Sequence, residues 1–453
     1  MKSKKLIVFS IVAILTILQF SIFSVKSRAE TDIQTDGDVT GTLDKETGIL
    51  TFSGTGDITR DLAFHFDNID SQGTRVKKII IGEGIKRIYI GFFMSFGELQ
   101  DIEVDDNNEA YCDIDGVLYR KDKTAILSYP RGRAGEYTIL DGVDRIGIYA
   151  FYRAEGLTNI TIPDSVKTIQ EASFYGCNLE SIKIPDGVTT IEKEAFDYCE
   201  YLEQVNIPEG ITTIEDGTFK DTFQLRYVEI PENVTSIGDE AFDSSPYIPI
   251  GMEVSEDELT DVYPIEIVVP NSVTSIGEMA FGKMNWMRQP VDTTIYCRSD
   301  SFAKQYVDEY NESYYDIICI TDDDAPTITN VSQDGSYIVI EANDGEGVGL
   351  KAKGYSLDGE NWVESNKIEV SESGTYTVYV RDKLYNVSSK EITIDIVDND
   401  QDYNDDKEPN KTDDSQSDKV IPNTGAKFPF VLIAVLAIAG IAYRNYKKYN
   451  FKM

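Results

Sequence analysis

The side chains that most often carry out chemistry in proteins are scarce in this chain of 453 residues. His65 is its one histidine, and the five cysteines lie far from it in sequence. A cysteine nucleophile needs an activating base, and a histidine-based triad or metal site needs a histidine beside other ligands or acids. The sequence therefore predicts no catalytic residue, no metal ligand and no cofactor.

Carboxylates are abundant, but their positions favour structural roles. Glycoside hydrolysis requires two carboxylates that converge on one bond, whereas many acids here follow the proline of a turn, at Asp164, Asp186, Glu209 and Glu232. A second acidic group lacks the spacing of an EF-hand calcium loop and comprises Asp105, Asp106, Asp113 and Asp115. We expect the acids to shape turns and to keep the chain soluble.

Short repeats are the elements that would hold any binding side chains in place. A β-branched residue is followed by isoleucine three positions on and phenylalanine five after that, at Ile85/Ile88/Phe93, Val143/Ile146/Phe151, Val166/Ile169/Phe174, Val188/Ile191/Phe196, Ile211/Ile214/Phe219, Val234/Ile237/Phe242 and Val273/Ile276/Phe281. Pro163, Pro185 and Pro208 lie 22 and 23 residues apart. A unit this short buries its apolar edge only against the next copy, so the spacing predicts a solenoid.

One repeat illustrates the expected local structure. Ile182 and Ile184 alternate with Ser181 and Lys183, which is the pattern of a half-buried strand. The proline, aspartate and glycine at 185–187 then turn the chain. Cys177 and Cys199 occupy a small, buried position three residues after the phenylalanine, and we expect both to be free core thiols; Cys112, Cys297 and Cys319 are not assigned.

These repeats resemble the BspA-type leucine-rich repeat, whose usual form is close to L-x-x-I-x-I-P-x-x-V-x-x-I-x-x-x-A-F. The resemblance covers about residues 76–318, and we place the solenoid at 76–320. It implies a mainly β fold and a bacterial surface protein of a kind often implicated in attachment. The expected fold class is therefore a BspA-type leucine-rich repeat solenoid followed by an immunoglobulin-like β-sandwich.

Both ends of the solenoid carry segments that we expect to cover it. Residues 30–75 contain two alternating strands around 45–48, which predict an N-terminal β-hairpin cap, followed by an irregular stretch with His65. After Phe281 the pattern predicts one strand, a helix around 301–310 and a last strand. An insertion at 246–264 breaks the spacing, and a binding loop and a neutral insertion are both open there.

A second domain is expected at 325–397, where short alternating strands recur. The segment 374–382 resembles the F strand of an immunoglobulin-like sandwich, with Tyr376 at the tyrosine corner and Val378 at the usual second-cysteine position. Trp362 is expected to be a core aromatic residue. The resemblance implies a spacer, with ligand or calcium binding as the alternative.

The two ends of the chain carry export and attachment signals. Lysines and an apolar run before Ala29 predict a signal peptide at 1–29. Behind an acidic linker at 398–420, Ile421, Pro422, Asn423, Thr424 and Gly425 resemble the sortase signal L-P-x-T-G, with isoleucine in place of leucine. The resemblance implies that sortase cuts after Thr424 and joins it to peptidoglycan of a Gram-positive wall. An apolar segment and basic tail at 426–453 would hold the precursor transiently in the membrane; retained membrane helices are the alternative.

The charge balance excludes one class of partner. The two terminal segments hold ten of the 42 basic residues and no acidic residue, so their removal leaves 32 basic against 79 acidic side chains, a net charge of −47. A polyanion would be repelled by such a chain, and nucleic acid is therefore not an expected partner.

The leading hypothesis is a wall-anchored adhesin or protein-binding scaffold that presents one face of its repeats. Its partners would be host matrix proteins or other bacterial surface proteins. The outward strand positions form the candidate binding face and include Thr161, Lys183, Asn206, Tyr227 and Glu229. The alternatives are a passive wall or biofilm component without a specific ligand and a wall-anchored hydrolase.

Overall fold

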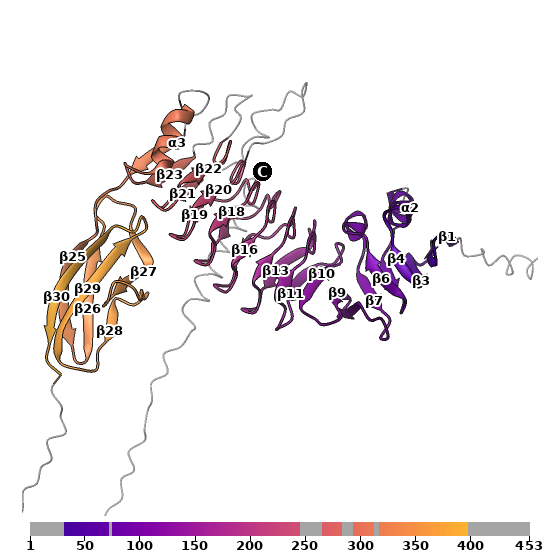
Figure 1. Ribbon diagram of the computed structural model, residues 1–453, viewed down its shortest axis with the longest axis horizontal. Coiled ribbons are helices and arrows are strands. Elements are labelled where there is room, and N and C mark those ends of the chain that lie inside the picture. The colour runs from indigo at the N-terminus through magenta and orange to yellow at the C-terminus, as the bar shows by residue number, and fades with distance from the viewer. Residues whose placement is uncertain (1–30, 72–74, 245–264, 283–292, 312–316, 397–453) are drawn as a thin grey trace, which may run out of the picture. The chain divides into compact units, whose positions relative to one another are not determined.

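The computed structural model describes residues 31–71, 75–244, 265–282, 293–311 and 317–396 (Figure 1). Within these residues the chain is mainly β. The helical elements there are α2 (Arg60–Ser71), α3 (Phe302–Asn311) and the 3₁₀ turn η1 (Phe92–Ser95).

The N-terminal strands form the cap that the alternating pattern predicts. Strands β1 (Thr31–Asp36), β2 (Val39–Asp44) and β3 (Ile49–Gly54) make an antiparallel meander, so the expected hairpin is present with one further strand. The last of them pairs in parallel with β5 (Lys78–Ile81), which pairs in turn with β7 (Asp101–Val104). The meander thereby covers the edge of the first solenoid strand.

The prediction of an irregular stretch around His65 is wrong, because these residues form helix α2. The Thr59 hydroxyl accepts a hydrogen bond from the Leu62 amide at 3.3 Å and caps the helix. Leu62 and Phe66 lie four residues apart on one face and are fully buried, and the Phe66 ring packs edge-on against Phe52 at 5.8 Å. His65 itself lies 2.6 Å from the Asp32 carboxylate.

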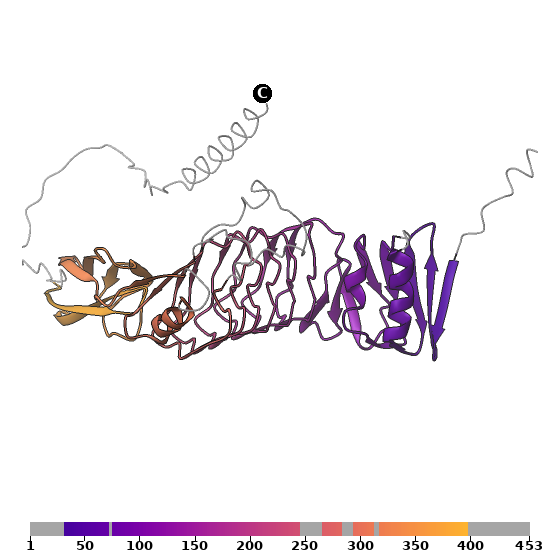
Figure 2. The same ribbon diagram turned by 90° about the horizontal axis from the view of Figure 1, so that it is seen from above.

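Parallel strands from successive repeats stack into two ladders, which confirms the solenoid (Figure 2). One ladder contains β15 (Ser181–Ile182), β17 (Gln204–Val205), β19 (Tyr227–Glu229), β21 (Glu266–Val268), β23 (Thr294–Cys297) and β24 (Ile318–Thr321). It is preceded by the parallel pair β11 (Gly135–Thr138) and β13 (Leu157–Thr161). The other ladder runs in two sections through β10 (Ala125–Ser128), β12 (Arg145–Ile146), β14 (Thr168–Ile169) and β16 (Thr190–Ile191), then β18 (Thr213–Ile214), β20 (Ser236–Ile237) and β22 (Ser275–Ile276).

A stack of phenylalanine rings fills the interior of the solenoid. Ring centroids of neighbouring coils lie 5.0–5.9 Å apart, along Phe151, Phe174, Phe196, Phe219, Phe242 and Phe281. All six side chains are buried. The phenylalanine positions of the sequence skeleton therefore identify the core correctly from its second copy onward.

The first copy of the skeleton is shifted. Phe93, the expected core residue, is only half-buried, whereas Phe92 is buried against Phe52, and the buried Phe96 ring packs against Phe92. Gly91 adopts a left-handed backbone with φ of 86° and begins the 3₁₀ turn, which displaces the interior position by one residue. The core of this first coil belongs to the N-terminal cluster rather than to the phenylalanine stack.

A hairpin turns the chain at 120–124. Strands β8 (Tyr111–Ile114) and β9 (Val117–Arg120) are antiparallel, and β9 continues through the turn into antiparallel pairing with β10. The expected C-terminal strand, helix and strand are confirmed as β23, α3 and β24. Cys177 and Cys199 are free and buried, as expected.

The region after residue 325 contains two three-stranded antiparallel sheets that share a core. One sheet contains β25 (Thr327–Asp334), β26 (Tyr337–Asn343) and β28 (Lys367–Glu369), and the other β27 (Leu350–Ser356), β29 (Gly374–Asp382) and β30 (Val387–Ile394). The Tyr376 hydroxyl donates to the Glu372 carbonyl at 2.8 Å, and Val378 is buried. Trp362 is not a core residue: it is half-buried beneath the Arg381 guanidinium at 4.1 Å.

Several expected segments lie outside the described residues. They are the signal peptide, the insertion at 246–264, the acidic linker, the sorting motif Ile421–Gly425 and the C-terminal apolar segment. Among the residues that are described, no helix is long and apolar enough to cross a membrane.

Candidate binding recess and strand face

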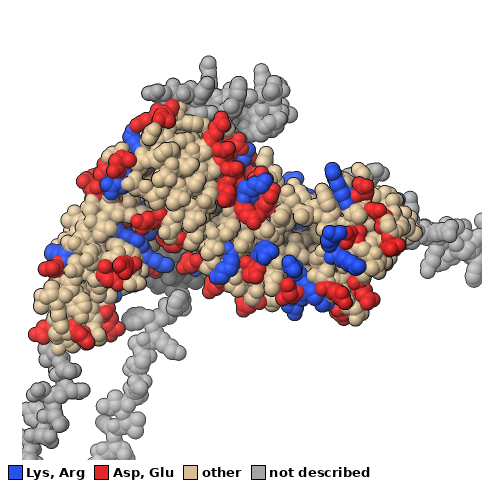
Figure 3. All heavy atoms as spheres, in the orientation of Figure 1, with Lys and Arg blue, Asp and Glu red and all other residues tan. Residues whose placement is uncertain are grey.

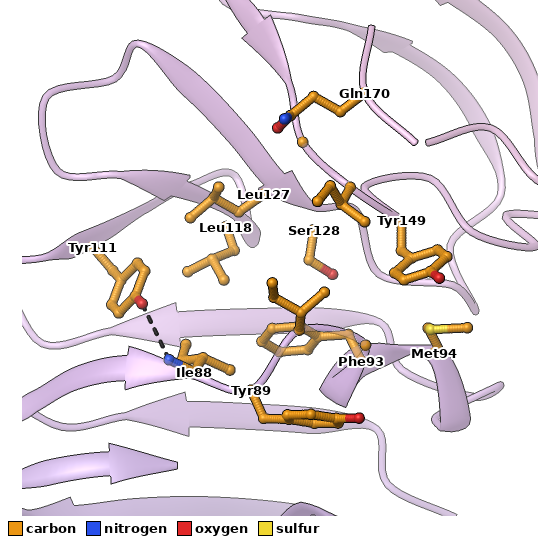
Figure 4. Close-up of a pocket in the computed structure, with 14 residues that line it drawn as sticks. Ile88, Tyr89, Phe93, Met94, Tyr111, Leu118, Leu127, Ser128, Tyr149 and Gln170 are labelled. Atoms are coloured by element: carbon orange, nitrogen blue, oxygen red, sulfur yellow. Dashed lines mark hydrogen bonds between the residues drawn. The ribbon is translucent and has the colours of Figure 1, made fainter. Parts of the chain in front are cut away.

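An apolar recess of about 270 Å³ opens between the first coil and the next ones (Figure 4). We call it the Tyr89 recess. It is lined by Ile88, Tyr89, Ile90, Gly91, Phe93 and Met94, by Tyr111, Leu118, Leu127 and Ser128, and by Gly147, Ile148, Tyr149 and Gln170. None of these described lining residues is charged, which sets the recess apart from the rest of this acidic chain.

The recess exists because one strand ladder is interrupted. Strand β6 (Ile85–Ile88) pairs with β4 (Gly56–Ile58), whereas the next strand on this side, β10, pairs with the hairpin strand β9 and with β12. The hairpin thus separates the first coil from the following stack. Side chains that would otherwise be covered by a neighbouring strand border the recess instead.

A hydrogen bond joins two residues that line the recess. The Tyr111 hydroxyl accepts a hydrogen bond from the Ile88 amide at 3.2 Å, drawn as the dashed line in Figure 4. Burial raises the pKa of Tyr111, so this hydroxyl stays neutral at physiological pH. The bond holds the Tyr111 ring against the strand that leads into Tyr89.

Exposed apolar side chains gather at the mouth of the recess. Ile90 is 62% exposed, Tyr89 39% and Phe64 42%, and the Phe64 and Tyr89 rings lie 6.4 Å apart. Exposed apolar groups of this kind mark sites of interaction when they cluster. These exposed residues were not predicted, although the sequence carries a signal for Ile90: the second residue after the skeleton isoleucine is apolar in the first two copies, at Ile90 and Ile148, and charged in the later copies.

A row of tyrosines continues from the recess along the solenoid. Tyr149 packs edge-on against Tyr152 at 5.8 Å, and Tyr152, Tyr175 and Tyr198 follow at 5.0 and 5.3 Å. Tyr198 is 38% exposed and the others are half-buried. The row presents ring edges and hydroxyl groups beside the recess.

The outward strand positions that the sequence singles out lie in one row on the other ladder. Thr161, Lys183 and Asn206 are exposed, while Tyr227 and Glu229 are half-buried. Two shallow hollows of about 350 and 340 Å³ lie over strands β15, β17 and β19 of this row. Basic and acidic side chains are interspersed on the face drawn in Figure 3.

Three members of this row already make contacts within the chain. The Asn206 amide donates to the Ile184 carbonyl at 2.7 Å and accepts from the Ile184 amide at 2.8 Å, which ties two coils together. Lys351 forms an ion pair with Glu229 at 2.6 Å, and the Lys383 ammonium lies 4.8 Å from the Tyr227 ring. Residues of the second sheet region therefore occupy part of the row.

Three aspartates form the group among the described residues that could hold a cation. The carboxylates of Asp322, Asp344 and Asp382 lie within 4.8 Å of one another. Burial raises the pKa of Asp382 to about 6, and hydrogen bonds from Asn386 offset part of this effect. Oxygen ligands of this type suit calcium. The group is not evident in the sequence because its members come from three separate segments.

Comparison with known proteins identifies the repeats. Residues 133–248 match the family model described as the BspA type leucine-rich repeat region, in six copies. This segment consists of BspA-type repeats. None of the curated proteins matches the chain.

Several solved structures match part of this chain at low sequence identity and low TM-score. A leucine-rich repeat protein from Eubacterium ventriosum is 20% identical, covers 50% of this chain and 99% of its own, and has a TM-score of 0.30. The pneumococcal vaccine antigen PcpA is 18% identical over 55% of this chain and 56% of its own, with a TM-score of 0.31. A leucine-rich repeat protein of T. pallidum is 18% identical over 48% of this chain and 99% of its own, with a TM-score of 0.29.

The strand ladders extend beyond the matched BspA-type repeats. Parallel pairing continues through β21, β23 and β24, all of which follow residue 248. The Tyr89 recess lies where the matched repeats begin: Gly147 and Tyr149 belong to them, whereas Tyr89 and Met94 precede them. The recess therefore joins the regular repeats to the N-terminal cap.

Proposed function

We propose that this protein is a bacterial surface protein that binds a partner protein through the Tyr89 recess. The BspA-type repeats support a scaffold on the cell surface. The observation that carries the binding proposal is the apolar recess with exposed Tyr89 and Ile90 at its mouth, on a chain of net charge −37. Water contact with these side chains is unfavourable, and a partner's apolar side chain would replace it.

The dimensions of the recess favour a protein partner. Its volume of about 270 Å³ is just below the range of small-molecule sites, which are roughly 300–1,000 Å³ and bury most of the ligand. A recess of this size accommodates one or two large apolar side chains. The tyrosine row beside it supplies aromatic residues of the type that is enriched at protein interfaces. Host matrix proteins and other bacterial surface proteins are the proposed partner classes.

Attachment to the wall is the second part of the proposal. The residues Ile421–Gly425 would be cut by sortase after Thr424, with peptidoglycan as the covalent partner. The sheets between 325 and 397, with the resemblance to an immunoglobulin-like sandwich, would act as a spacer between wall and repeats. The acidic linker at 398–420 would keep this spacer extended.

A binding measurement with matched variants tests the proposal. Purified residues 30–397 are titrated against a panel of matrix proteins and bacterial surface proteins, and the titration is repeated with Ile90→Asp. We expect saturable binding that weakens at least tenfold in the variant, because a charge at the mouth of an apolar contact costs about 1.4 kcal/mol or more.

Ile33→Asp is the matched control, since Ile33 is 61% exposed and Ile90 62%, but Ile33 lies on β1 outside the recess. Equal weakening in both variants would argue for a general charge effect. Loss of binding on Lys183→Glu, with Ile90→Asp unaffected, would move the site to the outward strand row. Absence of any binding would favour a passive wall component.

A further inference from the structure

We propose that Cys297 and Cys319 are a disulfide-forming pair that clamps the C-terminal end of the solenoid. Their sulfur atoms lie 3.3 Å apart in the thiol state. Cys297 ends β23 and Cys319 lies in β24, the last strand of the ladder. The inference does not depend on the proposed binding function.

The strand register places both thiols on the same face of the sheet. Cys319 pairs with Ile295, and Cys297, two residues further along its strand, pairs with Thr321. Residues two apart on a strand point to the same face. Ile295 and Cys297 are both fully buried, so this face is the interior, and Cys319 packs partly buried against the same core. Because Cys297 and Cys319 are diagonal neighbours across the ladder, a disulfide bond of about 2.0 Å requires a small approach of the two strands as well as rotation of the side chains.

The other three cysteines are committed to other contacts. Cys177 donates to the Phe151 carbonyl at 3.0 Å, and Cys199 donates to the Phe174 carbonyl at 3.1 Å. The Cys112 thiol donates to the Arg120 carbonyl at 3.3 Å. All five cysteines lie in described residues, and among them a hydrogen bond between two thiols joins Cys297 and Cys319 alone.

The two thiols of the pair differ in their exposure to solvent. Cys319 is partly exposed, whereas Cys297 is buried. The hydrogen bond from Cys297 lowers the pKa of Cys319, and the Lys304 ammonium on α3 acts in the same direction. A thiolate is the attacking species in disulfide exchange. Cys319 is therefore the thiol that meets an oxidant first.

Oxidation would proceed by two exchanges with a small disulfide such as oxidised glutathione. The Cys319 thiolate attacks one glutathione sulfur, forms a mixed disulfide and releases the first glutathione thiolate. Cys297 gives its proton to solvent, attacks the Cys319 sulfur and releases the second glutathione. Two protein thiols and one small disulfide thus yield one protein disulfide and two small thiols, and such bonds persist in oxidising compartments such as the exterior of the cell.

The bond would fix the segment that covers the end of the stack. Helix α3 lies between the two cysteines in sequence, and its Tyr306 packs edge-on against Phe281, the last ring of the phenylalanine stack, at 5.9 Å. A disulfide bond between the two ends of this segment restricts the conformations that the segment can adopt when it unfolds. We expect amide exchange in β24 to slow about tenfold in the oxidised form.

Thiol counting on the full-length chain tests the proposal. The reduced, folded protein is incubated with oxidised glutathione, alkylated after unfolding and mapped by mass spectrometry. We expect three of the five cysteines to be alkylated, with the peptides of Cys297 and Cys319 joined and two hydrogen atoms lighter. Five alkylated cysteines, or a bond between any other pair, would overturn the assignment.

Two variants make the test independent of stability. Cys297→Ser removes the resolving thiol, so a stable glutathione adduct should accumulate on Cys319; an unmodified Cys319 would contradict its role. Cys112→Ser is the control and should leave the joined peptides unchanged. Equal amide exchange in β24 before and after oxidation would overturn the clamp while leaving the bond itself in place.

Discussion

At the residue scale, the buried aspartates of the solenoid are the side chains that sequence patterns explain least. Asp197 and Asp221 are 7% and 5% exposed, and one carboxylate oxygen of Asp197 is buried without a hydrogen-bond partner. Burial raises the pKa of Asp197 to about 7, with a further contribution from Asp221, and burial raises the pKa of Asp221 to about 7, with a further contribution from Asp243. Lys220 offsets part of both shifts.

These aspartates predict that the protein is more stable in mild acid than in base. A carboxylic acid whose pKa is raised on folding stabilises the fold below its unfolded pKa of 3.8, and this contribution is lost as the pH rises through about 7. Between pH 5.5 and 8 we expect the free energy of unfolding to fall by about 2 kcal/mol for Asp197 alone. Asp197→Asn should reduce this pH dependence in denaturant titrations. Asp164→Asn, an exposed turn acid, is the control; an unchanged slope in Asp197→Asn would refute the argument.

The repeat pattern predicted the burial of the two core thiols but did not predict the burial of the aspartates. Cys177 and Cys199 occupy a slot that holds small residues in other copies, and burial there follows from the repeat itself. Asp197 follows Phe196 at a position where earlier copies carry Tyr152 and Tyr175. Sequence alone gives a carboxylate in such a slot no reason to be buried, since its burial depends on the coil that stacks above it.

At the element scale, the repeat spacing determines the ladders, whereas the recess depends on a missing strand pair. Equal spacing forces equivalent residues into register, and the phenylalanine stack follows directly from it. The Tyr89 recess arises because β6 does not pair with β10, and this depends on where the β8–β9 hairpin lies. Helix α2 was missed because its short apolar pattern, Leu62 and Phe66, lies between strand signals.

The stack predicts that damage to one coil spreads to its neighbours. Phe196→Ala removes a buried ring that lies 5.2 Å from Phe174 and 5.4 Å from Phe219, so we expect a loss of about 3–5 kcal/mol in the free energy of unfolding. Hydrogen exchange should rise in the coils that contain Phe174 and Phe219 as well. Tyr198→Ala, at 38% exposure, is the control with a small expected effect. Faster exchange confined to the coil of Phe196 would contradict a continuous core.

At the scale of the whole molecule, the sorting motif predicts the final location of the protein. Thr424→Ala removes the proposed site of cleavage, so the chain should stay with the membrane fraction instead of being joined to peptidoglycan. Cell fractionation followed by immunoblotting measures this. Asn423→Ala changes the variable position of the motif and should still reach the wall. Wall-bound Thr424→Ala protein would show that attachment does not use this motif.

Partner binding at the Tyr89 recess of a repeat scaffold is the central proposal for this protein. Hydrogen exchange of the protein with and without a partner from the binding panel tests this assignment most directly. We expect slower exchange in 88–94 and 147–149 on binding, with no change in Ile90→Asp at the same partner concentration. Protection confined to the outward strands around Lys183 and Asn206 would contradict the recess as the binding site.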